Sequence, residues 1–119
     1  MTADLFHIGH LRAIRQCAKY GEVIVGLLTD KALEGYKEAI IPFEQRKEIL
    51  EALPEVSRVV PQNSLYIENL KGIDCVASGD DFEPEEMEAI EKYGCKPLDI
   101  SYCYEQSTTK IREQINSIL

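Results

Sequence analysis

The sequence lacks the features of a membrane protein, a secreted protein and a metal-binding module. None of its apolar runs approaches the ~20 residues needed to cross a bilayer, and its first residues lack the charged-then-apolar layout of a secretory signal. The four cysteines stand at irregular spacings without a C-x-x-C pair, which argues against a zinc site and a disulfide framework. We therefore expect a cytoplasmic protein whose thiols are buried or idle.

Positive charge is also scarce. The chain has 13 Lys and Arg against 21 Asp and Glu, for a formal net charge of −8 at pH 7. Bulk binding to nucleic acid or to an anionic membrane is not expected, because phosphate neutralisation needs a basic surface. An anionic small molecule would need a local basic pocket. With 119 residues, of which 45% are hydrophobic, we expect a single domain over residues 1–119.

Helical and strand patterns alternate along the chain. Helical spacing around residues 11–18 stops at Gly21. The elements that follow are a strand at 23–29, a helix at 44–53, a strand at 58–60, a weaker helix at 64–71, a strand at 74–78, a helix at 83–93 ending at Gly94, a strand at 97–100, and a helix at 108–118 capped by Ser107 with a buried stripe of Ile111, Ile115 and Ile118.

This alternation predicts an α/β fold with a parallel sheet in a three-layer arrangement. One feature departs from the usual order. The chain opens on the loop before its first helix, whereas a parallel α/β unit normally brings a strand into such a loop. We therefore expect the first strand to be absent from this chain.

Both histidines lie in one segment, "ADLFHIGH" at residues 3–10. His7 and His10 could form a metal clip, a packed or capping helix start, or a phosphate site. A metal clip is disfavoured because no carboxylate or third histidine stands at ligand spacing. A loop that runs into a helix offers free backbone N–H groups and the positive end of the helix dipole, and Gly9 lets an anion approach the backbone. Capping and phosphate binding both remain open.

A second helix start has a similar character. "QSTTKIREQI" places Ser107, Thr108, Thr109 and Lys110 where backbone donors already point outward. The hydroxyls could serve as caps alone. Their density also suits an anion site.

Together these segments resemble the cytidylyltransferase-like nucleotidyltransferases over nearly the whole chain. "TADLFHIGH" is similar to the family's G-T-F-D-x-x-H-x-G-H loop, "VIVGLLTD" to its second strand, and "YKEAIIPFEQRKEIL" to its Lys-bearing loop and E-x-R-K helix. "ASGDDF" resembles the family's G-D-D-W loop, and "STT" its distal helix start. The resemblance implies a three-layer Rossmann-like nucleotidyltransferase fold with a parallel sheet.

The resemblance also implies a role for each matched residue. The catalytic set would be His7 and His10 at the α-phosphate, Lys37 at the acceptor phosphate, and Arg46 organising that side. The nucleotide-binding set would be Thr2, Asp4 and Gly9 in the loop beneath the nucleotide, Gly79, Asp80 and Asp81 at the cytosine and ribose edge, and Ser107, Thr108 and Thr109 at the β- and γ-phosphates. From the residues alone, a solvated Lys37, a surface ion-pairing Arg46 and a dipole-pairing Asp80–Asp81 remain open.

The implied reaction is attack of a phosphate oxygen on the α-phosphorus of CTP, with pyrophosphate leaving and Mg²⁺ balancing charge. The chain carries Tyr102 and Glu105 where the glycerol-phosphate enzymes carry arginine and glycine. This loss of positive charge favours a different acceptor, and the segment from Leu5 to Lys37 resembles cytidylyltransferase domains of phosphonate biosynthesis. Use of ATP by the same fold and a non-catalytic nucleotide-binding module remain alternatives. A homodimer is expected, with no nucleic acid or membrane partner.

Overall fold

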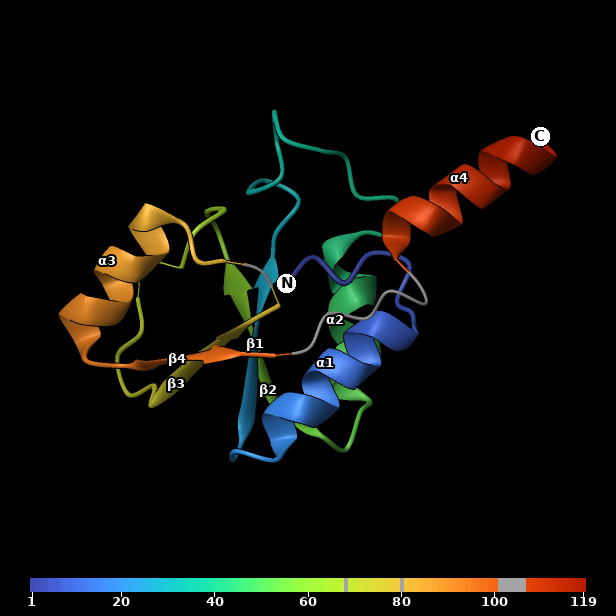
Figure 1. The fold of residues 1–119 in the computed structure, drawn as a ribbon. Helices are drawn as coiled ribbons and strands as arrows, with labels where there is room; N and C mark the ends of the chain where they lie inside the picture. The colour runs from blue at the N-terminus through green and yellow to red at the C-terminus, as the bar shows by residue number, and fades with distance from the viewer. Residues whose placement is uncertain (68, 80, 101–106) are drawn as a thin grey trace.

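In the computed structural model, residues 1–67, 69–79, 81–100 and 107–119 are described, and helices and strands alternate along them (Figure 1). The elements are α1 (Ile8–Ala18), β1 (Val23–Leu28), α2 (Phe43–Glu51), β2 (Val56–Gln62), β3 (Cys75–Ser78), α3 (Pro84–Tyr93), β4 (Lys96–Asp99) and α4 (Thr108–Ile118). The predicted α/β class is confirmed. Within the described ranges, no helix has the length and apolarity that crossing a bilayer requires.

Both strand pairs found in the described residues are parallel, as predicted. In the described part of the chain they form two sheets of two strands, β1 with β2 and β3 with β4. At the other edge of β1, the Met1 amine donates to the Gly26 carbonyl at 2.8 Å, and the Met1 carbonyl accepts the Leu28 N–H at 2.9 Å. Residues 1–67 are all described, and no strand precedes α1 there.

Each sheet has its own apolar cluster. Val23, Val25 and Leu27 alternate along β1 and so face the same side, where α1 and α2 pack on them. The cluster comprises Ala3, Ile14, Val23, Val25, Leu27, Leu50 and Val59. The second cluster joins α3 to β3 through Val76, Ala89 and Ile90, together with Leu70 and Cys95. Gly94 ends α3 in the left-handed conformation, at φ 70°, as the sequence predicts.

The helix predicted at residues 64–71 is wrong. The described residues of this segment form bends and turns. Side chains there bond to backbone carbonyls that a helix would need. The Gln62 amide donates to the carbonyls of Ser64 and Leu65 at 2.9 and 3.2 Å, and the Ser64 hydroxyl donates to the Tyr66 carbonyl at 2.7 Å. Such local side-chain bonds compete with the helical ladder.

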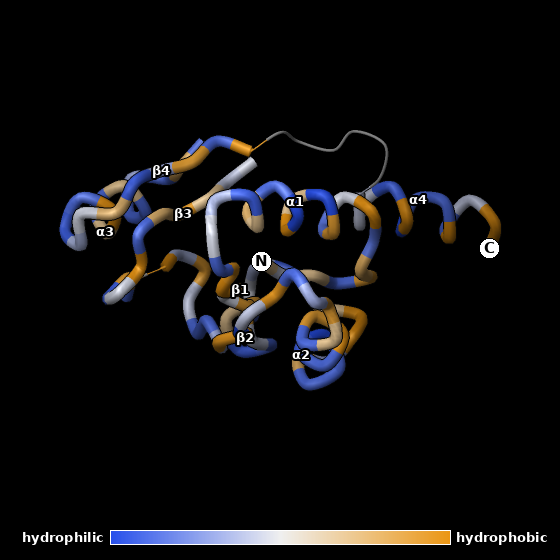
Figure 2. Tube along the Cα trace, turned by 90° about the horizontal axis from the view of Figure 1, so that it is seen from below, coloured by the Kyte–Doolittle hydropathy of each residue, from blue (hydrophilic) through white to orange (hydrophobic). Residues whose placement is uncertain are grey.

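The buried stripe predicted on α4 is also wrong. None of its residues is buried, and Ile115 and Ile118 are 44% and 83% exposed. The helix projects away from the two sheets, so that only its first turns approach the rest of the chain (Figures 1 and 2). The 3.6-residue spacing of the isoleucines predicts the helix correctly, but it does not show whether another element covers the apolar face.

Candidate functional site

The two histidines cap the start of α1 reciprocally. His7 is the N-cap residue, and its Nδ1 accepts the Gly9 N–H at 3.0 Å. His10 stands in the first turn, and its Nδ1 accepts the His7 N–H at 3.1 Å. The two ring centroids lie 3.9 Å apart, and the His10 ring stacks on Phe6 at 5.3 Å. The motif therefore orders the helix start, one of the alternatives left open by the sequence.

This capping leaves a donor on each ring. An Nδ1 that accepts a hydrogen bond carries no proton, so a neutral ring holds its proton on Nε2. Burial lowers the pKa of His7, and burial together with the nearby His7 lowers the pKa of His10 to about 4. Both rings are therefore neutral at pH 7 and keep an Nε2–H donor. Capping and phosphate binding are compatible because they use different nitrogens of the same ring.

Asp4 lies in the loop at residues 2–7 that leads into α1, here called the histidine loop, and joins it to two distant segments. Its side chain is 3% exposed, and its carboxylate accepts the N–H groups of Ile40 and Ile41, both at 2.9 Å, and Nη2 of Arg112 at 2.9 Å. Its own carbonyl accepts the Thr108 hydroxyl at 2.9 Å. Burial alone would raise the pKa of this carboxyl, but the two amides and Arg112 outweigh burial and hold the pKa below its usual value. In this structure Asp4 shapes the loop from beneath.

The backbone on both sides of Asp4 is strained. Ala3 and Leu5 have φ values of 52° and 50°, in the left-handed region that non-glycine residues rarely adopt. Each such residue costs on the order of 1–2 kcal/mol. The bonds that Asp4 makes to two distant segments offset this cost and fix the direction in which the chain enters α1.

Arg46, a buried residue of α2, bonds to the histidine loop and to the two segments beside it. Its side chain is 0% exposed. It donates to the carbonyls of Ile41, Thr2 and Leu28, each at 2.8 Å, and to the Asp30 carboxylate at 2.7 Å. A surface ion-pairing role is therefore wrong for this residue. Through these bonds Arg46 positions the histidine loop, the end of β1 and the loop before α2.

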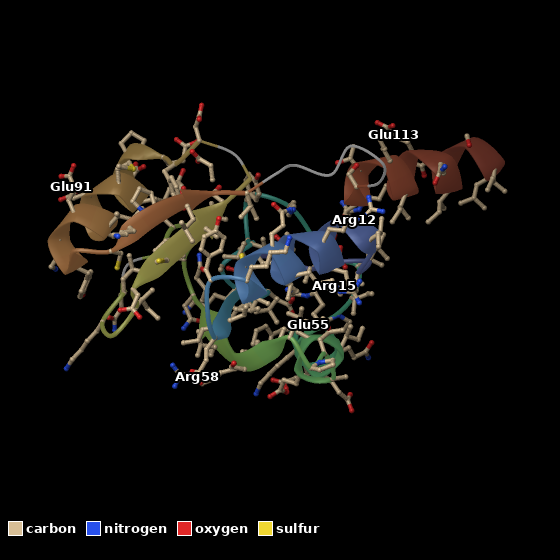
Figure 3. All side chains as sticks on the ribbon, turned by 60° about the horizontal axis from the view of Figure 1, so that its bottom comes forward. Arg12, Arg15, Glu55, Arg58, Glu91 and Glu113 are labelled. Carbon is tan, nitrogen blue, oxygen red and sulfur yellow. The ribbon has the colours of Figure 1, made fainter. Side chains whose placement is uncertain are left out.

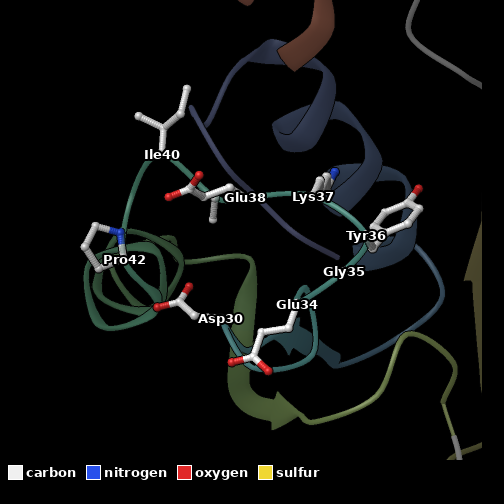
Figure 4. A pocket seen from close by; sticks show the side chains of 9 residues that line it. Asp30, Glu34, Gly35, Tyr36, Lys37, Glu38, Ile40 and Pro42 are labelled. Atoms are coloured by element: carbon white, nitrogen blue, oxygen red, sulfur yellow. The ribbon is translucent and has the colours of Figure 1, made fainter.

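The loop between β1 and α2 lines a cavity of about 530 Å³ (Figure 4). Its charged lining residues are Asp30, Glu34, Lys37 and Glu38. Lys37 is exposed, and its ammonium lies 5.8 Å from the centre of the Tyr36 ring. The Asp30 carboxylate is already paired with Arg46. Lys37 is thus the cationic side chain that the cavity offers to an anionic ligand.

The start of α4 lies against the histidine loop. The Ser107 hydroxyl accepts the Lys110 N–H at 3.0 Å, so Ser107 caps the helix as predicted. The Thr108 hydroxyl is bonded to Asp4, and Thr109 is exposed. The structure thus brings together two helix N-termini that stand a hundred residues apart in the sequence.

The third predicted part of the site comprises Gly79, Asp80 and Asp81, of which Gly79 and Asp81 are described. Gly79 directly follows β3, and Asp81 is exposed in the connection to α3. Among the described residues, no hydrogen bond links either of them to the histidine loop. Asp80 lies outside the described residues, as do Tyr102 and Glu105. Their roles at the base and the acceptor stay predictions.

Two residues of this network were not predicted from the sequence. Asp30 pairs with Arg46 and also accepts the Phe43 N–H at 3.3 Å, and Arg112 pairs with Asp4. The sequence position of each residue could have indicated its role. Asp30 follows the carboxyl end of a parallel strand, where α/β proteins gather their sites, and Arg112 stands four residues after Thr108, on the same helix face.

Comparison with known proteins agrees with these motifs. The family described as "Cytidylyltransferase-like" matches residues 2–119. The chain is 31% identical to the glycerol-3-phosphate cytidylyltransferase of Bacillus spizizenii, over 98% of this chain and 94% of that protein. It is 32% identical to the bifunctional protein HldE of Geobacter metallireducens, over 94% of this chain but only 25% of that protein.

A solved structure shows the same fold. The lipopolysaccharide core biosynthesis protein from Thermoplasma volcanium superposes with a TM-score of 0.65 at 21% identity, over 87% of this chain and 93% of that chain. The histidine motif, the Lys-bearing loop and the distal helix start therefore stand in the fold that the sequence predicts for them. The chain belongs to the cytidylyltransferase-like family of nucleotidyltransferases.

Proposed function

We propose that this chain transfers CMP from CTP to a small acceptor that carries a phosphate or a phosphonate. An oxygen of the acceptor attacks the α-phosphorus of CTP and forms the new O–P bond. The bond from the α-phosphorus to the bridging oxygen breaks, and pyrophosphate leaves with that oxygen. The product is a CDP-linked compound or a CMP-phosphonate.

The observation that carries this proposal is the pairing of two helix N-termini at Asp4, one of which presents two neutral imidazoles. Helix N-termini attract phosphate groups through free N–H groups and the helix dipole. The Nε2–H donors of His7 and His10 would contact the α-phosphate, where charge increases in the transition state. Fixed donors of this kind need no rearrangement as the reaction proceeds.

The acceptor is proposed to enter the cavity between β1 and α2. Its volume of about 530 Å³ suits a small molecule, and Lys37 would bind the attacking phosphate or phosphonate. The relatives in Bacillus are named for glycerol 3-phosphate. Tyr102 and Glu105 depart from the pattern of those enzymes, which supports a different acceptor and makes phosphonates the first compounds to test.

Mg²⁺ is proposed to enter with the triphosphate. The Asp4 carboxylate already accepts three hydrogen bonds, and nowhere in the described ranges do three or more His, Cys, Asp or Glu side chains group as a metal site. This donor set fits an ion that takes most of its ligands from substrate phosphates and water. When bound, the ion would balance phosphate charge, while the residues of this chain bind and orient the nucleotide.

A pyrophosphate-release screen tests the proposal. CTP and ATP are each combined with Mg²⁺ and a panel of phosphate and phosphonate acceptors. We expect release with CTP and at least one acceptor. Release with ATP alone would indicate an adenylyltransferase. Binding of CTP without release for any acceptor would indicate a non-catalytic module and contradict the proposal.

A further inference from the structure

Arg112 connects α4 to the loop between β1 and α2 that carries Lys37, here called the Lys37 loop. One nitrogen of its guanidinium, Nη2, donates to the Asp4 carboxylate at 2.9 Å and to the Glu38 carbonyl at 3.1 Å. Its two partners lie 108 and 74 residues away in the sequence. Arg112 thus bonds directly to the residue that follows Lys37.

The loop has few other attachments near Lys37. Residues 34–38 are all exposed, and the Lys37 N–H makes a local bond to the Leu33 carbonyl at 3.0 Å. Further along, the N–H groups of Ile40 and Ile41 bond to Asp4. Arg46 holds the end of this loop through the Ile41 carbonyl. Nearer Lys37, the contacts to other segments go through Asp4 and the Glu38 carbonyl, and Arg112 bonds to both.

Asp4 in turn needs Arg112. Its carboxylate is 3% exposed, and the ion pair with Arg112 supplies its positive partner. Removing one member of a buried pair leaves an uncompensated charge, which destabilises the structure that buries it. The Thr108 hydroxyl, one helical turn before Arg112, bonds to the Asp4 carbonyl. Thr108 and Arg112, on one face of α4, therefore both bond to Asp4.

We propose that Arg112 is a positioning residue that holds the Lys37 loop in register with the start of α4 through Asp4 and the Glu38 carbonyl. The inference rests on the proposed function, in which α4 binds the triphosphate and Lys37 binds the acceptor. The contacts of Arg112 would then fix the distance between the two substrates. Its loss would affect the acceptor more than the nucleotide.

The test compares Arg112→Ala, Arg112→Lys and a matched control, Arg15→Ala. Arg15 also lies on a helix and pairs with a carboxylate, Glu55 at 4.0 Å (Figure 3). It is not among the partners described for Asp4 or for the Glu38 carbonyl. For Arg112→Ala we expect KM for the acceptor to rise about tenfold or more, as for loss of a charged hydrogen bond, with CTP affinity changing about twofold at most. Arg112→Lys should recover part of the loss, because an ammonium can still pair with Asp4.

A second readout does not depend on activity. Amide hydrogen exchange at Ile40 and Ile41 should quicken about fivefold or more in Arg112→Ala and stay unchanged in Arg15→Ala. Unchanged exchange at these amides, or equal acceleration throughout α1 and α2, would overturn the proposal. If Arg112→Ala does not fold, Arg112→Lys must show the same two effects in smaller measure. A wild-type chain that transfers nothing would contradict the proposed function, while exchange at Ile40 and Ile41 would still decide whether Arg112 holds the loop.

Discussion

The two functions assigned to the His7 ring can be separated by substitution. Its Nδ1 accepts a backbone N–H, and its Nε2 is left as a donor. In His7→Asn, the side-chain oxygen occupies about the position of Nδ1 and keeps the cap, but no atom replaces Nε2. In His7→Gln, the amide nitrogen lies near the position of Nε2, while the acceptor at Nδ1 is lost.

Loss of the cap is measured by stability and loss of the Nε2 donor by kcat, and the two losses differ in size. Loss of an N-cap costs about 1 kcal/mol of stability, which lowers Tm by about 3–6 °C in a chain of this length. Loss of one fixed donor in a transition state costs about 2.7–4 kcal/mol, or about 10²–10³ in kcat. We therefore expect His7→Asn to melt near the wild type with kcat at least about 10²-fold lower. His7→Gln should melt lower and lose less of kcat.

The assay is pyrophosphate release under saturating CTP, with Tm, CTP affinity by calorimetry and bound zinc measured on the same preparations. Glu86→Ala, which removes the carboxylate that accepts the Glu83 N–H at 3.1 Å at the start of α3, is the control for loss of a cap alone. It should lower Tm and leave kcat unchanged. Wild-type turnover in His7→Asn would refute the catalytic interpretation. Stoichiometric zinc that a chelator removes along with activity would instead support the metal clip.

Four further predictions concern pH, the acceptor, the base and assembly. Because burial keeps His10 neutral in the folded chain, with a pKa of about 4, the unfolded chain binds more protons below about pH 6.5. Stability should therefore fall as the pH drops from about 6.5 towards 4, and thermal melts of His10→Gln should show a weaker dependence. Lys37→Ala should raise KM for the acceptor about tenfold with CTP affinity retained, and an unchanged KM would remove Lys37 from the acceptor site. Calorimetry should show tighter binding of CTP than of ATP, and equal affinities would contradict the assignment of the base. Light scattering at micromolar concentration should give the mass of a homodimer, and a monomer mass would refute that expectation.

Local patterns predicted most of the fold because they reflect local physics. Alternating burial along β1, the left-handed Gly94 and the serine cap of α4 each depend on a few neighbouring residues. The failures depend on partners that a pattern does not show. The helix predicted at residues 64–71 does not form because side chains there bond to backbone carbonyls. The apolar spacing of α4 predicted a helix but did not indicate whether another element covers its apolar face.

The site was predictable in its residue types but less so in their contacts. The histidine motif indicated capping or phosphate binding; the structure shows the capping, and it leaves on each ring the Nε2 that phosphate binding would use. Asp4 and Arg46 were expected near the substrates, yet their bonds go to other parts of the chain. These bonds span up to 108 residues, and no local spacing encodes a contact at that separation.

The arrangement of charge also explains how an acidic chain can bind an anion. With a net charge of −8, the protein could bind the proposed triphosphate only where its local donors outweigh the general repulsion. Arg46 and Arg112 lie close to the site, but the bonds described for them go to backbone carbonyls, Asp30 and Asp4. Among the described residues, Lys37, the two helix N-termini and the neutral imidazoles are donors that an anion could use, and Nε of Arg112 has no partner in the described structure. Because most of these donors are dipoles fixed by the fold, the orientation of the histidine loop matters more to binding than the number of basic residues.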